Sequence, residues 1–326
     1  MRFTANIRCI AKFLCLCLVA SPLAAIPLEA GLAQTPKSSR EPASSGPHKA
    51  EQAVKDLLAR AKRGEPDAEY RLASLGLMGK LGKQEPKNVI GLLVSASGKG
   101  HREATFMLGM LNIKGWNMPQ DPAKAAALFE RGAKAGHIQS QNALANLLYA
   151  GTGVTQDKAK AADWFQQAAD RESGIAQTNL GLMYLRGDGI PKDSTRGIAM
   201  LTRAAEAGVT GAQHNLATVY ATGEGGVPQD AARAMQWFAK AAEAGNQRAQ
   251  YDLGVRLVKG MGFDPNPPEG MKWLMIAAVG PDAKLRTTAR DTINKVSPAI
   301  GNKGVIDAGE ASKLWLMRRQ WQVKSQ

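Results

Sequence analysis

The chain has 326 residues, a formal net charge of +14 and only 6% aromatic residues. All three cysteines precede residue 18, so the rest of the chain can form neither a disulfide nor a thiolate metal site, and it has no cysteine nucleophile. The basic charge suits an acidic protein or an anionic glycan or lipid surface. The absence of a Lys/Arg-rich run interleaved with aromatic residues argues against a nucleic-acid partner.

Residues 1–33 have the pattern of a secretory signal peptide. Three basic residues precede an apolar run from Phe13 to Ala20, and small residues then lead to a plausible cleavage site after Ala33. Prolines interrupt the apolar stretch, which makes it short for a membrane-spanning helix. We therefore expect a periplasmic or secreted protein. The alternative is an uncleaved leader that anchors it in the inner membrane.

The segment after the leader divides into a linker and a helix. Residues 34–49 contain three prolines and four serines with little to bury, which indicates a disordered, flexible linker. Residues 50–63 place Val54, Leu58 and Ala61 on one side of a helix. This helix resembles the second half of a missing repeat, so we expect it to cap the N-terminal end of the array.

The region 64–280 repeats one helix–turn–helix pattern six times. Aligned on a Leu-Gly or Leu-Ala pair in each first helix, the units are 64–99, 100–135, 136–171, 172–207, 208–244 and 245–280. Each has 36 residues except the fifth, which has one extra glycine. Two short helices cannot bury all of their apolar surface alone, so the units are expected to stack on one another.

Two features recur at fixed places within the units. An acidic residue in each turn is expected to accept a hydrogen bond from a free amide and so cap the second helix. These residues are Glu85, Asp121, Asp157, Asp193, Asp230 and Asp264. A bulky pair on the second helix is expected to lie in the core. The pairs are Leu92-Leu93, Leu128-Phe129, Trp164-Phe165, Met200-Leu201, Trp237-Phe238 and Trp273-Leu274.

The strings AQTNLGLMYLRGDGIPKD (176–193), AQHNLATVYATGEGGVPQD (212–230) and MQWFAKAAEAG (235–245) resemble Sel1-like repeats, relatives of the tetratricopeptide repeat with a longer turn. The resemblance implies an all-α fold, an α/α superhelical solenoid of helix–turn–helix repeats. The sequence departs from the pattern at Glu172, where a glycine usually begins the unit, and in the degraded first and last units. Degraded ends are typical of terminal repeats.

Residues 281–326 depart from the repeat and are expected to form a helical cap on the C-terminal end. A helix over 281–296, a break at Ser297-Pro298 followed by Gly301 to Gly304, and a last helix over about 305–322 are predicted. Similar tails occur on exported Sel1-like proteins, which supports a cap more than a separate domain.

The sequence shows no catalytic, cofactor or metal constellation. The four histidines, His48, His101, His137 and His214, share no ligand spacing, which favours solvated imidazoles over a metal site. The glycine-rich run that ends at Gly100 lacks the Ser or Thr of a phosphate loop. Each turn supplies a single acid, whereas a calcium site needs several oxygen ligands.

The tetratricopeptide resemblance implies that the first helices line a concave groove. Carried onto these units, the groove residues are Phe106, Met110, Gln139, Asn142, Asn146, Thr178, His214, Thr218, Arg248 and Tyr251. Amide and hydroxyl side chains both donate and accept hydrogen bonds, which suits an extended peptide or a partner helix. The alternative is that these are ordinary solvated helix positions.

The sequence therefore predicts an exported, non-enzymatic scaffold or adaptor that holds a partner protein or peptide in its groove. The resemblance further implies a role in envelope signalling or surface polysaccharide control. One alternative is a hydrolase acting on the cell wall or on a β-lactam, and another is a basic module that docks on anionic glycan or lipid.

We expect the substitutions Asn142→Ala and Asn146→Ala to weaken partner capture with little loss of stability, and Trp237→Ala to destabilise the fold by about 3–5 kcal/mol.

Overall fold

The computed structural model describes residues 47–80 and 86–324. The predicted leader, most of the predicted linker and the turn acid Glu85 lie outside these residues. The described chain is helical, with turns between the helices and no strand. It forms two compact units, one ending at Ala176 and the other beginning at Gln177.

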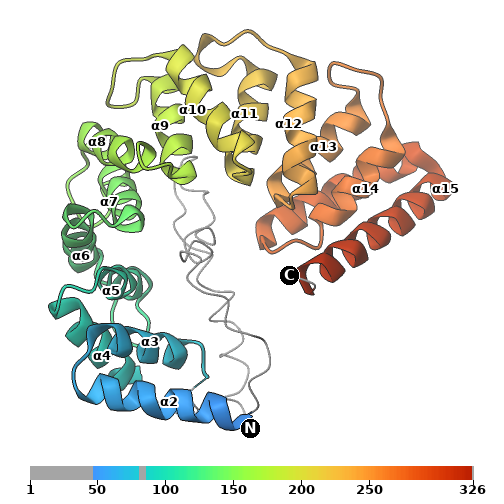
Figure 1. Cartoon of the computed structure of the whole chain (residues 1–326). Helices are drawn as coiled ribbons and strands as arrows, with labels where there is room; N and C mark the ends of the chain where they lie inside the picture. The colour runs from blue at the N-terminus through green and yellow to red at the C-terminus, as the bar shows by residue number, and fades with distance from the viewer. Residues whose placement is uncertain (1–46, 81–85, 325–326) are drawn as a thin grey trace. The chain divides into compact units, whose positions relative to one another are not determined.

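The first unit consists of antiparallel helix pairs that follow one another in chain order (Figure 1). Its helices are α2 (Pro47–Lys62), α3 (Pro66–Leu77), α4 (Pro86–Gly98), α5 (Arg102–Lys114), α6 (Pro122–Lys134), α7 (Ile138–Ala150) and α8 (Lys158–Ala169). The segment predicted as the N-terminal cap lies in α2, where Leu57, Leu58 and Ala61 pack against Ala68 and Leu72 of α3. The first repeat therefore has a helical neighbour on this side.

The second unit continues the same arrangement. Its helices are α9 (Gly174–Arg186), which begins just before the boundary, then α10 (Ser194–Glu206), α11 (Thr210–Thr222), the short 3-10 helix η2 (Glu224–Gly226), α12 (Ala231–Glu243), α13 (Gln247–Lys259), α14 (Pro267–Ala277) and α15 (Ala283–Lys324). The extra glycine of the fifth repeat lies in η2, where Gly225 has a φ of 76°. The insertion is thus absorbed in the turn, and the helices on either side keep the 13-residue length.

The turn acids cap the second helices at four of the five described positions. Asp121, Asp157, Asp193 and Asp230 each accept a hydrogen bond from the backbone N–H three residues later, at 2.8 to 2.9 Å. The prediction for Asp264 is wrong, because Asn266 caps α14 and accepts from the N–H of Glu269 at 3.2 Å. The backbone hydrogen bonds of the turn show which residue occupies the capping position. The Asn266 N–H donates to Leu257 O, just as the Asp157 N–H donates to Leu148 O.

The bulky pairs of the second helices divide into one buried and one less buried member. The buried members are at most 2% exposed: Leu93, Phe129, Phe165, Leu201, Phe238 and Leu274. Trp237 is only half-buried, and the ammonium of Lys240 lies 4.2 Å from its ring centroid. The expectation that these tryptophans lie in the core is confirmed for Trp273, which is buried, and partly for Trp164, which is half-buried and packs against a core cluster. It is wrong for Trp237.

In four of the repeats, buried polar side chains form hydrogen bonds to the second helix of the repeat before. The amide Nε2 atoms of Gln141, Gln213 and Gln250 donate to carbonyl oxygens in the last turn of the preceding second helix, at 3.4, 3.0 and 3.1 Å. At the corresponding place in an earlier repeat, Thr105 shares a hydrogen bond of 2.9 Å with Ser97. Since these groups are buried, the bonds fix the register of neighbouring helices.

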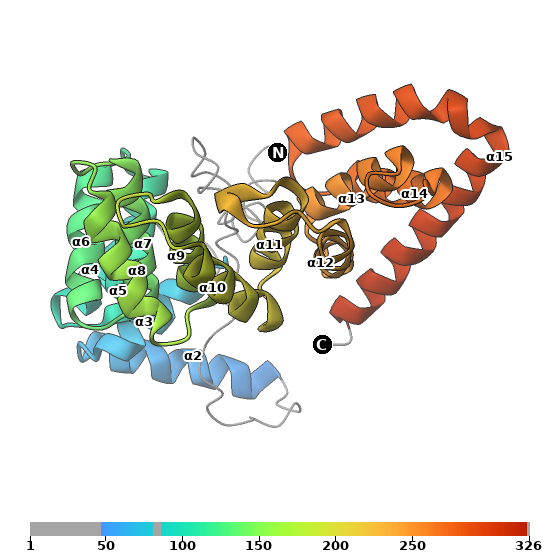
Figure 2. The same ribbon diagram turned by 90° about the horizontal axis from the view of Figure 1, so that it is seen from above.

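The C-terminal region is α15, which consists of two helical segments joined at a sharp bend (Figure 2). The predicted interruption between two helices is present, but it lies at Gly301 and not at Ser297-Pro298. The helix continues past Pro298 and bends at Gly301, whose φ of 75° and ψ of 163° suit only glycine. Before the bend, Ala289 and Ile293 pack on Ala277 of α14. Each half of α15 therefore covers a different part of the last repeat.

After the bend, α15 lies along α14 and reaches the end of α12. The rings of Trp315 and Trp273 meet edge to face, with centroids 5.6 Å apart. Arg319 donates to the carbonyl oxygens of Glu243 and Ala244 at 2.7 and 2.6 Å, where α12 ends. Its guanidinium therefore satisfies carbonyls that have no partner within their own helix.

Candidate functional site

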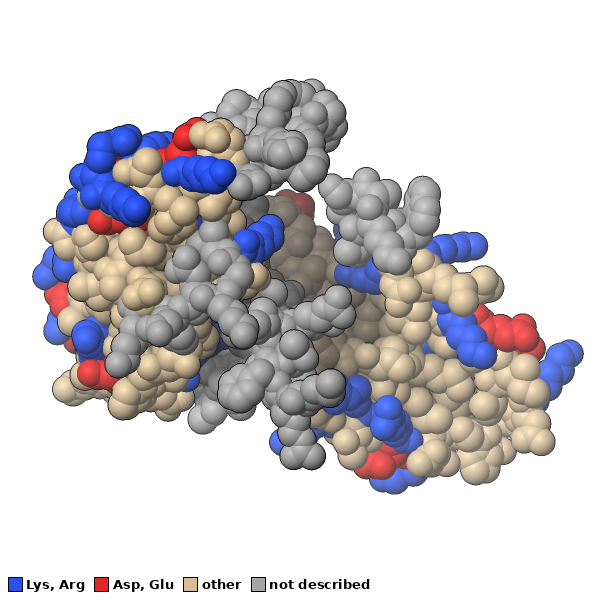
Figure 3. Space-filling view, turned by 90° about the horizontal axis from the view of Figure 1, so that it is seen from below, with Lys and Arg blue, Asp and Glu red and all other residues tan. Residues whose placement is uncertain are grey.

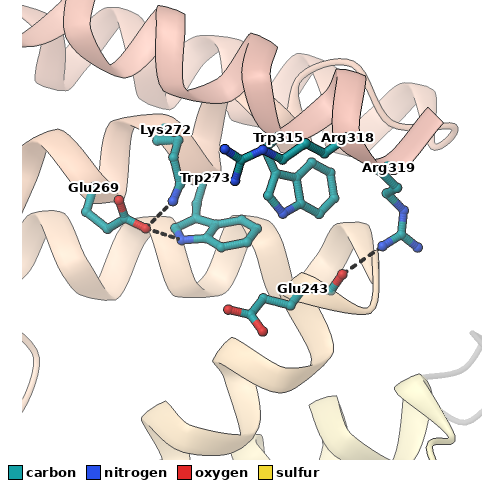
Figure 4. Close-up of a pocket in the computed structure, with 7 residues that line it drawn as sticks. All are labelled: Glu243, Glu269, Lys272, Trp273, Trp315, Arg318 and Arg319. Carbon is teal, nitrogen blue, oxygen red and sulfur yellow. Dashed lines mark hydrogen bonds and ion pairs between the residues drawn. The ribbon is translucent and has the colours of Figure 1, made fainter. Parts of the chain in front are cut away.

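A hollow of about 390 Å³ lies where α12, α14 and α15 meet (Figure 4). Its walls are Glu243, Glu269, Lys272, Trp273, Trp315, Arg318 and Arg319. Most of these groups already have partners. Glu269 accepts from Lys272 and, at 2.9 Å, from the Trp273 indole. With Trp273 only 4% exposed and Arg319 bonded to α12, we assign this hollow to the joint that holds α15 in place.

In the first unit, the predicted groove residues divide by burial. Met110 is in the core against Phe129, and Asn142 is buried with its amide donating to Ser173 Oγ at 2.9 Å. Gln139 and Asn146 are half-buried, so some of their surface stays open to a partner. The expectation that Asn142→Ala would cost little stability does not fit a buried, bonded amide.

Phe106 is half-buried and forms part of an aromatic contact between repeats. Its ring lies 5.4 Å from the imidazole of His137 and 5.6 Å from the ring of Phe129, centroid to centroid. His137 itself is buried, and its Nδ1 lies 2.9 Å from Ser140 Oγ. Burial lowers the pKa of His137 below the ordinary value of 6.5. His137 is therefore a packing residue at the start of α7, not the solvated imidazole that the sequence suggested.

In the second unit, Thr178 is buried, but the other predicted residues lie on the half-buried or exposed part of α11 and α13. His214 Nε2 lies 2.8 Å from Asp252 Oδ2, and Arg248 Nε lies 3.2 Å from the same oxygen. We call these three residues, His214, Arg248 and Asp252, the Asp252 cluster. It joins the first helices of two successive repeats through side chains.

The remaining two predicted residues flank the Asp252 cluster. Thr218 Oγ1 donates to the backbone oxygen of His214 at 3.0 Å. The Tyr251 hydroxyl lies 3.3 Å from Thr292 Oγ1 of α15. Neither hydroxyl is directed at the imidazole, so the cluster has the form of a hydrogen-bonding and charged surface instead of an activated nucleophile. Across the described residues, no group of three or more His, Cys, Asp or Glu side chains is placed to hold a metal ion.

Asp252 was not among the residues predicted from the sequence. The available signal was its position four residues after Arg248, a spacing that brings opposite charges together on one helix. Its bond to His214 spans 38 residues and depends on how the repeats stack.

Helix α13 carries three basic residues, Arg248, Arg256 and Lys259, and one acidic residue, Asp252. Arg248 is 63% exposed, and the guanidinium of Arg256 lies 4.9 Å from the ring centroid of Phe238 without a carboxylate partner in the described chain. On the face shown in Figure 3, Lys and Arg side chains are scattered over each unit with acidic residues among them. The positive charge is therefore distributed, and no single large patch stands out in that view.

Together, the repeated helix pairs and the polar surface of their first helices define an all-α repeat protein. Six segments match the Sel1 repeat model: residues 66–89, 102–137, 138–173, 174–209, 210–246 and 247–278. The chain therefore belongs to the Sel1 repeat family. Sel1 repeat proteins are generally protein-interaction scaffolds, and this type of fold is typically non-catalytic.

One solved structure supports the same fold, and two others are similar at lower TM-scores. A Sel1 repeat protein from Oxalobacter formigenes is 27% identical with a TM-score of 0.66, and the alignment covers 72% of this chain and 94% of that one. The protective antigen c5321 of uropathogenic Escherichia coli is 24% identical with a TM-score of 0.49, covering 82% and 64%. The immunity protein Pa5087 of Pseudomonas aeruginosa is 22% identical with a TM-score of 0.43, covering 71% and 82%. No protein with a curated description matches the sequence significantly.

Proposed function

We propose that this protein is a non-enzymatic scaffold that binds a partner protein or peptide on its first helices, with the Asp252 cluster as the main contact in the second unit. The observation that carries this proposal is the exposed guanidinium of Arg248, oriented by Asp252 beside the imidazole of His214. An oriented guanidinium can donate to a backbone carbonyl or a carboxylate of a partner. The half-buried Thr218 and Tyr251 offer further polar contacts on the same helices.

Membership of the Sel1 repeat family supports the scaffold role. In the first unit, the half-buried amides Gln139 and Asn146 are the corresponding candidates for contact with a partner. Asn142, Met110 and Thr178 contribute to packing instead, and we leave them out of the proposed contact surface.

We further propose that the protein is exported, with cleavage after Ala33. The support is the order of basic, apolar and small residues at the start of the chain. Among the helices of the described residues, none is both long and apolar enough to cross a membrane. The test is mass spectrometry of the protein from periplasmic and membrane fractions. A mature N-terminus at Gln34 supports export, whereas an intact leader in the membrane fraction supports the anchored alternative.

The partner proposal is tested by site-specific photo-crosslinking in cells. A photoreactive residue replaces Arg248 in one variant and Arg233 in another. The two are matched, because Arg233 is 62% exposed and also pairs with an aspartate, Asp230, but lies on a second helix. Crosslinks to one defined protein from position 248 and not from position 233 are expected. Equal crosslinking from both positions contradicts the proposed surface.

The hydrolase alternative has its own test. Wild-type protein that hydrolyses nitrocefin or peptidoglycan, and loses this activity in His214→Ala while keeping its fold, would replace the scaffold proposal with an enzymatic one. The hydroxyl of Thr218, one turn after His214 in α11, donates to a backbone carbonyl. We therefore expect no hydrolysis.

A further inference from the structure

The outer side of α15 after the bend carries apolar side chains that the chain leaves exposed. Ile306, Leu314 and Met317 are 61%, 55% and 64% exposed, and they are three of the seven large apolar side chains exposed among the described residues. The opposite side of this half holds Ala308, Ser312 and Trp315, which face the second unit. Figure 2 shows this half of α15 along one side of that unit.

The exposed residues form a narrow seam with the spacing of a coiled coil. Lys303, Ile306, Glu310, Lys313 and Met317 follow one another at alternating intervals of three and four residues, and all five are exposed. This is the a and d pattern by which one helix packs against another. We call these five residues and the adjacent Leu314 the α15 seam.

The charges of the α15 seam have no partners within the described chain. Glu310 and Lys313 form no ion pair with any described residue, although they lie three residues apart on one helix. Two nearby basic residues, in contrast, have partners within the chain. Arg319 is bonded to the end of α12, and Lys272 is paired with Glu269. The two charges at the middle of the seam are thus available to a second molecule.

The order of residues along the α15 seam makes it complementary to itself in the antiparallel direction. A two-fold axis level with Ala311 and Ser312 places Ile306 opposite Met317 of a second copy, and Glu310 opposite Lys313 of that copy. Each pairing occurs twice, as a two-fold interface requires. An antiparallel pair of helices also aligns a positions with d positions, which is the alignment that this register produces.

From this self-complementarity we propose that the protein forms a homodimer through the α15 seam, with the two copies of this helix antiparallel. The occupant is a second copy of the chain because the seam supplies its own apolar and charged counterparts. The contact is small, with two ionic layers between its apolar layers, and it belongs among weak, reversible interfaces.

The test exploits the symmetry of the central ion pairs. Sedimentation equilibrium of the full-length mature protein is measured from about 1 to about 200 µM, the range for a small interface. Glu310→Lys places two like-charge pairs in the dimer, and so does Lys313→Glu. Each single variant should therefore dimerise at least about tenfold more weakly than the wild type.

An equimolar mixture of the two variants should restore dimerisation. In the mixed dimer, Lys at position 310 of one chain faces Glu at position 313 of the other, and the second pair keeps the native Lys313 and Glu310. The double variant, which exchanges both charges in one chain, should also dimerise like the wild type. Only an antiparallel contact between these two positions produces this pattern.

Control variants make the same net-charge changes on exposed residues elsewhere in the second unit. Lys284→Glu matches Lys313→Glu, and Glu206→Lys matches Glu310→Lys. Both controls should leave the dimerisation constant within about twofold, because these positions lie away from the seam. Circular dichroism checks that every variant stays helical.

Two results would overturn the proposal. One is a wild-type protein that stays monomeric over the whole concentration range, which would leave the α15 seam to a different partner. The other is a dimer that Glu310→Lys and Lys313→Glu do not weaken, since such a dimer must use another surface.

Discussion

At the boundaries between repeats, single residues with positive φ allow the chain to turn from one helix into the next. Most second helices end on a glycine with positive φ, as at Gly64, Gly100, Gly136 and Gly208. Glu172 takes this place in one repeat and adopts the same left-handed conformation, with a φ of 62°. The departure visible in the sequence at Glu172 is therefore a local strain in the backbone, and it leaves the repeat intact.

Gly208→Ala isolates the cost of the left-handed conformation. Gly208 has a φ of 84° and open space where a Cβ would lie, so only backbone strain opposes the substitution. The variant should lose about 1–2 kcal/mol of unfolding free energy in chemical denaturation. Gly211→Ala is the matched control, because Gly211 also has open space but lies in α11 at ordinary φ. It should be neutral or stabilising by up to about 1 kcal/mol, and equal losses in both variants would contradict this explanation.

His137 makes the stability of the first unit dependent on pH. Its pKa is lowered chiefly by burial, and the positive charges of Arg102 and Arg171 lower it further against the opposing effect of Glu103. The unfolded chain therefore binds a proton more readily than the folded one below about pH 6.5. The contribution of His137 to the free energy of unfolding should therefore be greatest above this pH. It should decrease as the pH falls towards the pKa that His137 has in the folded protein.

The pH dependence is measured by urea denaturation of the wild type and His137→Asn between pH 7.5 and pH 5. Asparagine does not titrate and is favourable at the start of a helix, so the variant should show a smaller loss on acidification. An unchanged loss would show that other groups cause the dependence.

At the scale of the helices, the two members of each bulky pair should differ in their contribution. Phe238 is fully buried, whereas Trp237 is half-buried beneath Lys240. Phe238→Ala should cost about 3–5 kcal/mol, and Trp237→Ala should cost clearly less. Denaturation followed by circular dichroism gives both values. A larger loss for Trp237→Ala would contradict the burial pattern.

The attachment of α15 provides a second test at this scale. Arg319 bonds two carbonyls at the end of α12, whereas its neighbour Arg318 is exposed and makes no such bond. Arg319→Gln should reduce stability by about 1–2 kcal/mol, and Arg318→Gln should change it by less than about 0.5 kcal/mol. Chemical denaturation followed by circular dichroism gives both values. Equal effects of the two substitutions would show that the α12 contact is unimportant.

The elements could be predicted from sequence because their signals recur. Period, turn acids and small residues are all visible six times, and the caps at Asp121 and Asp157 follow from them. The error at Asp264 arose because a nearby aspartate resembled the true cap, Asn266, whose identity depends on backbone register. The break between the two halves of α15 was predicted across Ser297-Pro298 and Gly301 to Gly304. Only its placement at Pro298 was wrong, because the helix accommodates this proline and the positive φ of Gly301 interrupts it.

The candidate site was less predictable than the fold. The position of a residue along a first helix indicates on which side of the helix its side chain lies. Whether that side chain is buried depends on which residues of the neighbouring repeat cover it. Asn142 is consequently covered and bonded to Ser173, while Arg248 stays exposed. The contact between His214 and Asp252 joins two repeats, so no local pattern reveals it.

At the scale of the whole molecule, six Sel1 repeats form two compact units, and the second carries both the Asp252 cluster and the α15 seam. The two surfaces lie on different helices, so partner binding and dimerisation should respond to different substitutions. Glu310→Lys should weaken dimerisation without changing the intrinsic affinity for a partner peptide. Titration of the monomeric variant with that peptide measures this, and a lost affinity would show that the surfaces are coupled.

The central claim is that the exposed first-helix surface around Asp252 binds a partner. The most direct measurement is the dissociation constant of the crosslinked partner, once purified, for wild-type protein, Arg248→Glu and the matched Arg233→Glu. We predict at least about tenfold weaker binding for Arg248→Glu and a change below about twofold for Arg233→Glu. Equal affinity of all three proteins would contradict the account.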